Sequence, residues 1–256
     1  MEKYSERAHQ ATIQERLGSR GNGFTPFEPS GLAAISELFD EQARRDPLKH
    51  AVVDGDGALT FAELQLFSNG VRRALRRAVR ERRPIAVLAG RHTRFVAAAL
   101  GVLGAGGFYV PLDPRFPETR NARILHQAGA RVLLTEAGLM PLALRLLPDN
   151  DALICLDEVE WHASAPRERA DQDGPACIIF TSGSTGAPKG VIQTRRNLLQ
   201  LVRRYTNALF IGHADRVSLL SSCSVTASIA PMLSSLLNGA TLSGFSVLER
   251  GASGIS

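Results

Sequence analysis

Cysteine is scarce in this sequence of 256 residues, with three scattered copies at Cys155, Cys177 and Cys223. An odd number at no recognised spacing argues against a disulfide framework or a cysteine-based metal site, and predicts reduced thiols in a cytoplasmic protein. No apolar run reaches the ~18 residues that a membrane-spanning helix needs. The polar N-terminus MEKYSERAHQ also lacks the apolar core of a secretion signal. We therefore expect neither membrane insertion nor secretion.

Lysine is rare beside arginine, since only three of the 30 basic residues are lysines, at Lys3, Lys49 and Lys189. Seven of the arginines fall in VRRALRRAVRERR (71–83), which raises the question of a nucleic-acid partner. The apolar residues around this segment recur at helical spacing, which predicts an amphipathic helix with the arginines on its solvated face. No aromatic residues are interleaved for base stacking, so we expect no nucleic-acid binding.

Short apolar stretches alternate with helical patterns from residue 25 onward, after a polar leader at 1–24. Apolar strands that alternate with helices predict an α/β fold with mostly parallel sheets flanked by helices. HAVVDGDGALT (50–60) is predicted to form two strands around a turn, and not a calcium loop, because its twelfth position is Gln65 instead of Glu. The other expected strands are 84–90, 108–112, 131–136, 152–157, 176–181, 216–222 and 240–245, and the helices are 31–46, 91–107, 117–130, 195–210 and 228–239.

The stretch TSGSTGAPKG (181–190) places one of the rare lysines among glycines and hydroxyl side chains, directly after the apolar strand ACIIF. Ligand sites in parallel sheets lie at the carboxyl ends of strands, where this stretch begins. Glycines permit close backbone approach, consecutive amides can form an anion-binding concavity, and a lysine adds a point charge. These features together predict a phosphate site. The residues expected to contact phosphate are Thr181, Ser182, Gly183, Ser184, Thr185, Gly186 and Lys189. A Walker-type loop is not expected, because Lys189 lies between Pro188 and Gly190.

The segment IIFTSGSTGAPKGVI resembles the phosphate-loop signature of the adenylate-forming (AMP-binding) superfamily, which includes acyl-CoA synthetases and the adenylation domains of nonribosomal peptide synthetases. Three more stretches follow the order of the family's motifs. They are LTFAEL (59–64), LGAGGFYVPLDPRFPETR (103–120), and DRVSLLSS with LLNGATL (215–222 and 236–242). The second has the form typical of peptide-synthetase adenylation domains, and a fragment of an acyl-CoA synthetase is the alternative.

The resemblance implies that the chain is the N-terminal part of the large domain of such an enzyme. It implies ATP and Mg²⁺ as cofactors, a carboxylic acid as substrate, and a phosphopantetheinyl carrier protein or domain as partner. The acid would be converted to an acyl-adenylate and then transferred to the carrier's thiol. Lys189 and Thr185 would take the catalytic roles in the phosphate loop, and no residue is assigned to a metal.

Two departures from the family pattern affect this expectation. Amino-acid-activating members usually carry Phe-Asp-Ala-Ser, whose Asp pairs with the substrate ammonium, where this sequence has Val225-Thr226-Ala227-Ser228. Since Thr226 supplies no charge, we expect an acid without a standard α-amino group, unless Thr226 merely packs or another residue anchors the amine.

The second departure is that the family's later motifs do not occur in the 256 residues. Residues 25–256 are therefore expected to form a truncated, incomplete adenylation domain, with an exposed sheet edge near 240–245. The chain is either part of an adenylating enzyme, recorded as a fragment or completed by another polypeptide, or a remnant without catalysis that binds a partner. In both cases the isolated chain is expected to be inactive.

Overall fold

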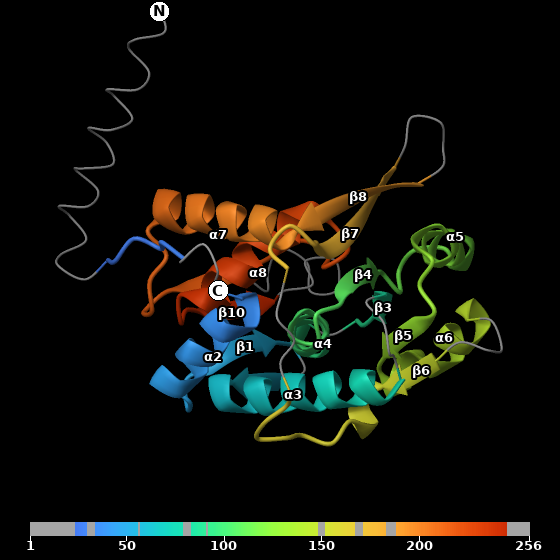
Figure 1. Cartoon of the computed structure of the whole chain (residues 1–256), viewed down its shortest axis with the longest axis horizontal. Helices are drawn as coiled ribbons and strands as arrows, with labels where there is room; N and C mark the ends of the chain where they lie inside the picture. Colours follow the sequence, from blue (N-terminus) through green and yellow to red (C-terminus); the bar gives the residue numbers. More distant parts are fainter. Residues whose placement is uncertain are drawn as a thin grey trace, which may run out of the picture.

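The chain folds into two mostly parallel β-sheets with helices between and around them (Figure 1). The computed structural model describes residues 24–29, 34–55, 57–78, 83–90, 92–147, 152–166, 171–182 and 188–244. Of the predicted leader, only Phe24 lies among them, and its ring packs edge-on against Phe210 at 5.4 Å between centroids.

The smaller sheet has four strands in the order β2-β1-β10-β9. They are β1 (His50–Asp54), β2 (Gly57–Thr60), β9 (Arg216–Leu219) and β10 (Thr241–Gly244). β1 and β2 form the predicted antiparallel hairpin, whereas β10 runs parallel to both of its neighbours. The carboxylate of Asp54 accepts hydrogen bonds from the backbone and hydroxyl of Thr93 (both 3.0 Å), so it ties the hairpin to the start of the helix that contains Thr93.

The larger sheet has six strands in the order β6-β5-β3-β4-β7-β8. They are β3 (Pro84–Leu88), β4 (Phe108–Leu112), β5 (Val132–Thr135), β6 (Ala152–Cys155), β7 (Pro175–Ser182) and β8 (Pro188–Thr194). All neighbours are parallel except β7 and β8. β8 was not predicted from the sequence, because its glycine and proline residues suggested a continuous loop.

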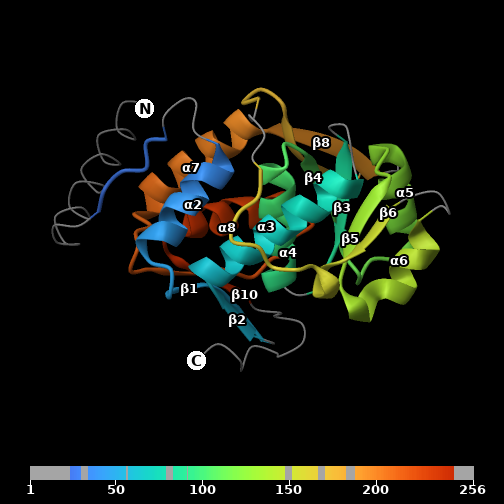
Figure 2. The same ribbon diagram turned by 60° about the horizontal axis from the view of Figure 1, so that its bottom comes forward.

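The helices are α2 (Ile35–Arg45), α3 (Phe61–Ala78), α4 (His92–Gly104), α5 (Glu118–Ala128), α6 (Met140–Leu146), α7 (Arg195–Leu209) and α8 (Ile229–Leu237). Figures 1 and 2 both place α4 between the two sheets, where it contacts β1, β3 and β4. α5 and α6 cover the opposite face of the larger sheet. α6 was not predicted from the sequence.

Alternation along β3 shows why the central strands are apolar throughout. Ile85 and Val87 belong to the core that contains α4, whereas Ala86 and Leu88 belong to the core under α5 and α6. Successive side chains of a strand point to opposite faces, so a strand covered on both faces needs an apolar residue at every position. The predicted α/β fold with buried parallel strands is confirmed.

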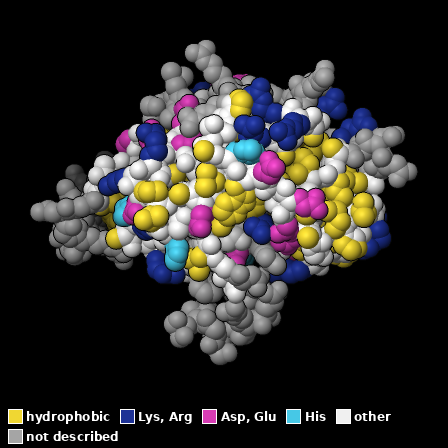
Figure 3. Space-filling view, turned by 90° about the horizontal axis from the view of Figure 1, so that it is seen from below, with side chains coloured by type: hydrophobic (Ala, Val, Ile, Leu, Met, Phe, Trp, Pro, Cys, Tyr) yellow, Lys and Arg dark blue, Asp and Glu magenta, His cyan; other side chains and the backbone are white. Residues whose placement is uncertain are grey.

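Arg72 corrects the prediction that the arginines of 71–83 lie on a solvated face. Arg76 and Arg77 are exposed, but Arg72 is only 2% exposed and packs against Gly104 of α4. A Cβ atom at Gly104 would overlap the guanidinium of Arg72, so the glycine provides the space for this group. On the face seen in Figure 3, basic side chains are mixed with acidic and hydrophobic ones.

The sheet edge expected near residues 240–245 is also a correction. β10 lies between β1 and β9, and all four of its residues are buried. The edge strand that does expose apolar side chains is β8, where Val191 and Ile192 are 43% and 59% exposed. The order of the strands along the chain did not reveal this, because β10 inserts between earlier strands.

Candidate functional site

The predicted phosphate loop lies between two paired strands. β7 and β8 are antiparallel, and their register places Thr181 opposite Lys189 and Ser182 opposite Pro188. The hydroxyl of Thr181 lies 3.5 Å from the carbonyl oxygen of Lys189, and both residues are exposed. The structure therefore brings together the two ends of the predicted site. Gly183, Ser184, Thr185 and Gly186 lie outside the described residues.

Gly190 explains how β8 lies so close to β7. It is paired with Phe180, and a Cβ atom there would lie 3.0 Å from the Phe180 ring and 3.0 Å from the side chain of Ile178. A larger residue would force these two side chains of β7 to move. The absence of a side chain at Gly190 thus lets the strand that carries Lys189 pack closely against the ring of Phe180.

The neighbouring strand β4 delivers a buried acid to the same end of the sheet. Tyr109 of β4 pairs with Cys177 of β7, and four residues further along each chain segment are Asp113 and Thr181. Because the strands are parallel, both residues lie at carboxyl ends, where ligand sites of α/β sheets occur.

Burial raises the pKa of Cys177 to about 12, so its thiol is not a nucleophile at neutral pH.

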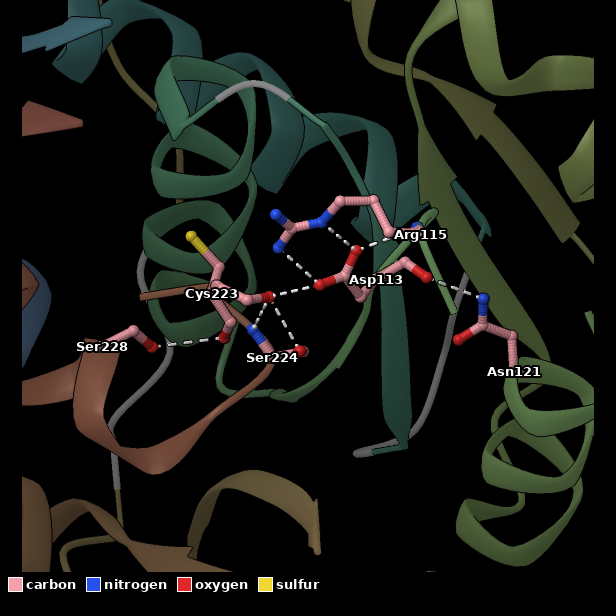
Figure 4. A network of polar contacts seen from close by, with 7 residues as sticks. Asp113, Arg115, Asn121, Cys223, Ser224 and Ser228 are labelled. Carbon is pink, nitrogen blue, oxygen red and sulfur yellow. Dashed lines mark hydrogen bonds and ion pairs between the residues drawn. The ribbon is translucent and has the colours of Figure 1, made fainter. Parts of the chain in front are cut away.

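Asp113 is 3% exposed in its side chain and is held by several donors (Figure 4). Arg115 donates from Nε to Oδ1 at 2.9 Å and from Nη2 to Oδ2 at 2.8 Å, and its backbone also donates to Oδ1 at 2.9 Å. Ser222 donates from its hydroxyl to Oδ2 at 2.6 Å. Asn121 holds the backbone carbonyl of Asp113 at 2.9 Å.

The pKa of Asp113 reflects opposing effects. Burial acts first and raises it, but hydrogen bonds from Arg115 and Ser222 and the charge of Arg115 outweigh burial and place the pKa below its ordinary value. Asp113 is therefore a carboxylate at neutral pH, and its charge is already paired.

The segment 222–228, which follows β9, carries the predicted acid-pocket residue. Thr226 begins a short 3₁₀ turn, Thr226–Ser228, and is exposed. Its side chain is thus open to a ligand and is not part of the core. Within this described segment no charged side chain takes the place of the family's Asp.

Arg195 is a buried residue that holds backbone carbonyls. It lies in the sequence Thr194-Arg195-Arg196-Asn197, where the family often has Thr-His-Arg-Asn. Arg195 is 2% exposed and donates to four backbone carbonyls, those of Gly107 (2.7 Å), Pro175 (2.8 Å), Gly106 (2.9 Å) and Asp171 (3.5 Å). Its charge lies beside the C-terminal turn that follows α4, where cations are favoured. Arg195 therefore joins β7, α7 and the α4–β4 turn.

Asp113, Ser222 and Arg195 were not predicted from the sequence as site-supporting residues. Asp113 carries the clearest signal, because it is an acidic residue directly after an apolar strand that was predicted to be parallel. Ser222 and Arg195 had no comparable signal, since their partners lie 109 and 89 residues away.

A strand-end segment with the predicted phosphate residues, a buried acid at the end of the neighbouring strand, and the segment with the predicted acid-pocket residue are arranged as expected for an α/β domain of the adenylate-forming class. The model of the family described as "AMP-binding enzyme" matches residues 39–248, and the chain belongs to this family.

The similar curated relatives are peptide-synthetase proteins. One of the plipastatin synthase proteins of Bacillus subtilis (strain 168) is 37% identical over 214 residues, which are 82% of this chain and 6% of the relative. Bacitracin synthase 1 of Bacillus licheniformis is 34% identical over 221 residues, 84% of this chain and 4% of that protein. The chain thus spans a small fraction of these relatives.

Solved structures agree with this assignment. The nonribosomal peptide synthetase FmoA3 in its AMPPNP-bound form is 32% identical with a TM-score of 0.76, covering 91% of this chain and 24% of FmoA3. FmoA3 has also been solved with alpha-methyl-L-serine-AMP, at 31% identity and a TM-score of 0.73, covering 93% of this chain and 26% of that one. The predicted family, in its peptide-synthetase form, is confirmed.

The described residues contain no group of three or more His, Cys, Asp or Glu side chains arranged to hold a metal ion. Within the same part of the chain, no helix has both the length and the apolar character to cross a bilayer.

Proposed function

We propose that this chain supplies the phosphate-binding and acid-binding parts of an ATP-dependent enzyme that activates a carboxylic acid. In the reaction, the acid's carboxylate attacks the α-phosphate of ATP, the bond to the β-phosphate breaks, and pyrophosphate leaves with its electron pair. The product is an acyl-adenylate. The phosphopantetheine thiol of a carrier protein then attacks its carbonyl carbon, the bond to the phosphate breaks, AMP leaves, and the thiol proton passes to solvent as the thioester forms.

The observation that carries this proposal is the pairing of Thr181 with Lys189 across β7 and β8, at the ends of the predicted phosphate loop. An ammonium on an exposed strand position beside a hydroxyl suits phosphate oxygens, which need charge and directed donors. Mg²⁺ bound with ATP would neutralise further phosphate charge. The residues of this chain that we propose to bind the phosphates of ATP are Thr181, Ser182, Gly183, Ser184, Thr185, Gly186 and Lys189.

For the acid, we propose a substrate without a standard α-amino group, such as an aryl, keto, hydroxy or fatty acid. An ammonium bound near Thr226 would lack the carboxylate that usually pairs with it, and an unpaired buried charge is costly. The FmoA3 complex with alpha-methyl-L-serine-AMP favours an amino acid in that relative. The uncharged Thr226 favours a different acid in this chain.

We also propose that the 256 residues do not complete the reaction by themselves. The family resemblance assigns the ribose-binding Asp, the Mg²⁺-holding Glu and a catalytic Lys to motifs that this sequence does not contain. The second candidate function is phosphate binding without catalysis.

ATP–pyrophosphate exchange tests these proposals. We would compare the isolated chain with a fusion in which residues 39–248 replace the matching segment of the plipastatin synthase relative. We expect no acid-dependent exchange by the isolated chain, and exchange by the fusion with acids that lack an α-amino group. Strong exchange with ordinary α-amino acids alone would contradict the acid assignment. If a folded fusion shows no pyrophosphate exchange with any acid, the result would favour the second candidate, phosphate binding without catalysis.

A further inference from the structure

The contact between Asp113 and Ser222 joins the two sheets next to the proposed acid pocket. Asp113 follows β4 of the larger sheet, and Ser222 lies three residues after β9 of the smaller sheet. Their 2.6 Å hydrogen bond spans 109 residues of sequence. Figure 4 shows the two segments approaching each other, with Asp113 pointing toward the segment that contains Cys223, Ser224 and Ser228.

The hydrogen bonds at Ser222 use the full capacity of its hydroxyl. A serine hydroxyl has one proton and two lone pairs. The proton goes to Oδ2 of Asp113, because the carboxylate can only accept. The Ser222–Ser224 contact of 2.8 Å must therefore have Ser224 as its donor, and the backbone N–H of Ser224 donates to the same oxygen at 3.2 Å. The charge of Asp113 thus sets the direction of the whole chain of hydrogen bonds.

The rest of the segment is braced by its own backbone. The N–H of Val225 donates to the Ser222 carbonyl at 3.2 Å, and the N–H of Ser228 donates to the Val225 carbonyl at 3.1 Å. The hydroxyl of Ser228 also donates to the Val225 carbonyl at 2.7 Å. Two linked turns therefore carry Thr226 as one unit, and Ser222 at the start of that unit is its connection to Asp113.

Asp113 is well suited to act as the fixed point. Its bidentate pairing with Arg115 immobilises the carboxylate, and Asn121 holds its backbone carbonyl. A hydrogen bond to a charged acceptor is stronger than one between neutral groups, and a paired acceptor in a buried place loses little freedom when it forms.

We propose that Asp113 is a positioning residue for the acid-binding segment: through Ser222 it fixes the turns that carry Thr226. It touches neither the acid nor ATP in this proposal. The description of 222–228 as acid-binding rests on the proposed function, whereas the coupling of Asp113 to the segment does not. Asp113, which follows β4 of the larger sheet, thereby positions a segment that follows β9 of the smaller sheet.

The experiment measures amide hydrogen exchange of the 256-residue chain and its variants Ser222→Ala and Asp113→Ala. The reporters are the amides of Val225 and Ser228, because their acceptors are backbone carbonyls that neither variant removes. Both variants should speed exchange at these amides by about 10- to 100-fold, the range expected for a hydrogen bond to a charged group. The double variant should show no further change, because both substitutions break the same link.

Controls separate positioning from a general loss of stability. Amides of β3 report global opening and should exchange as before in Ser222→Ala. Ser222→Thr retains the hydroxyl and should restore slow exchange. Asp173→Ala removes another aspartate with a bidentate arginine partner, Arg196, and should leave the reporters unchanged.

In the active fusion, Ser222→Ala should raise KM for the acid about 10-fold and leave KM for ATP within about twofold, as loss of one charge-assisted hydrogen bond would. Unchanged exchange at Val225 and Ser228 in both single variants would overturn the proposal, and so would independent effects in the double variant. A fusion without pyrophosphate exchange would contradict the proposed function but not the coupling, so the two failures are distinguishable.

Discussion

Thr181 and Lys189 are direct partners across the antiparallel pair of β7 and β8, with the Thr181 hydroxyl 3.5 Å from the Lys189 carbonyl oxygen. The backbone of Lys189 is thereby held in a strand while its side chain remains exposed. Because the backbone of Lys189 is already held in a strand, less conformational freedom would be lost on binding the proposed phosphate.

Lys189→Ala should lower kcat/KM for ATP in the pyrophosphate-exchange assay of the fusion by about 10- to 100-fold, the range of one charge-assisted hydrogen bond. Lys189→Arg should retain part of the activity, because it keeps the charge but not the compact geometry. The matched control is Arg196→Ala, which removes another exposed charge and should change kcat/KM little. Equal losses in both variants would indicate a general charge effect.

Thr226→Asp should shift acid preference toward α-amino acids. The new carboxylate would pair with the substrate ammonium, and the relative kcat/KM for an amino acid should rise about 10- to 100-fold. Thr226→Asn has the same shape without the charge and should show no such shift. Parallel acid panels in the exchange assay measure the ratio, and an unchanged ratio in Thr226→Asp would mean that the ammonium lies elsewhere.

Gly104→Ala should lower the free energy of unfolding by about 1–3 kcal/mol, because overpacking a close-packed site costs this much. The new methyl would overlap the guanidinium of the buried Arg72. Gly138→Ala is the control, since nothing lies within 4 Å of a Cβ atom there. Urea titrations of both variants measure the difference. A Gly104→Ala variant as stable as the parent would show that Arg72 moves aside freely.

Arg195→Ala should lower the free energy of unfolding by about 2–3 kcal/mol, because it leaves four carbonyls without their charged donor. Arg196→Ala changes the next residue, whose guanidinium forms an exposed pair with Asp173, and should leave the unfolding midpoint in place. If both variants unfold at the same urea concentration, the carbonyl contacts of Arg195 do not stabilise the fold.

The lowered pKa of Asp113 should make part of the free energy of unfolding depend on pH in the acid range. Its pKa in the folded chain lies below the ordinary 3.8, since the hydrogen bonds from Arg115 and Ser222 outweigh burial. The stabilisation is therefore fully present above about pH 4 and is lost as pH falls through the folded pKa. As the pH falls from about 7 to about 2, the unfolding midpoint should decline less steeply in Asp113→Asn than in the parent.

The control for this measurement is Asp173→Asn. Its pKa is also lowered, by the hydrogen bond from Arg196, but the carboxyl is fully exposed and screened by solvent. A parallel decline in the parent and Asp113→Asn would show that Asp113 does not contribute to the acid transition.

Much of the fold could be predicted from the sequence because its strands and helices have clear patterns. β4 was predicted with its observed bounds, and α7 and β5 within one or two residues, since each combines an apolar pattern with a proline, glycine or charged boundary. β8 was missed because Gly190 and Pro188 suggested a loop, and β10 was misplaced at an edge because strand order depends on long-range pairing.

A candidate site could be proposed from the sequence only where its residues are close in sequence. The residues 181–189 are contiguous, so their chemistry was visible as a motif. The Asp113–Ser222 contact joins residues that are 109 positions apart, and the contact of Arg195 with Gly106 joins residues that are 89 apart, so neither contact had a local pattern.

Binding of the phosphates of ATP by residues 181–189 is tested most directly by residue-resolved NMR of the 256-residue chain titrated with AMPPNP. The predicted result is a saturable set of amide shift changes centred on 181–189, which Lys189→Ala weakens about 10-fold or more. No saturable shifts at millimolar AMPPNP, or shifts confined to other parts of the chain, would contradict phosphate binding at this loop.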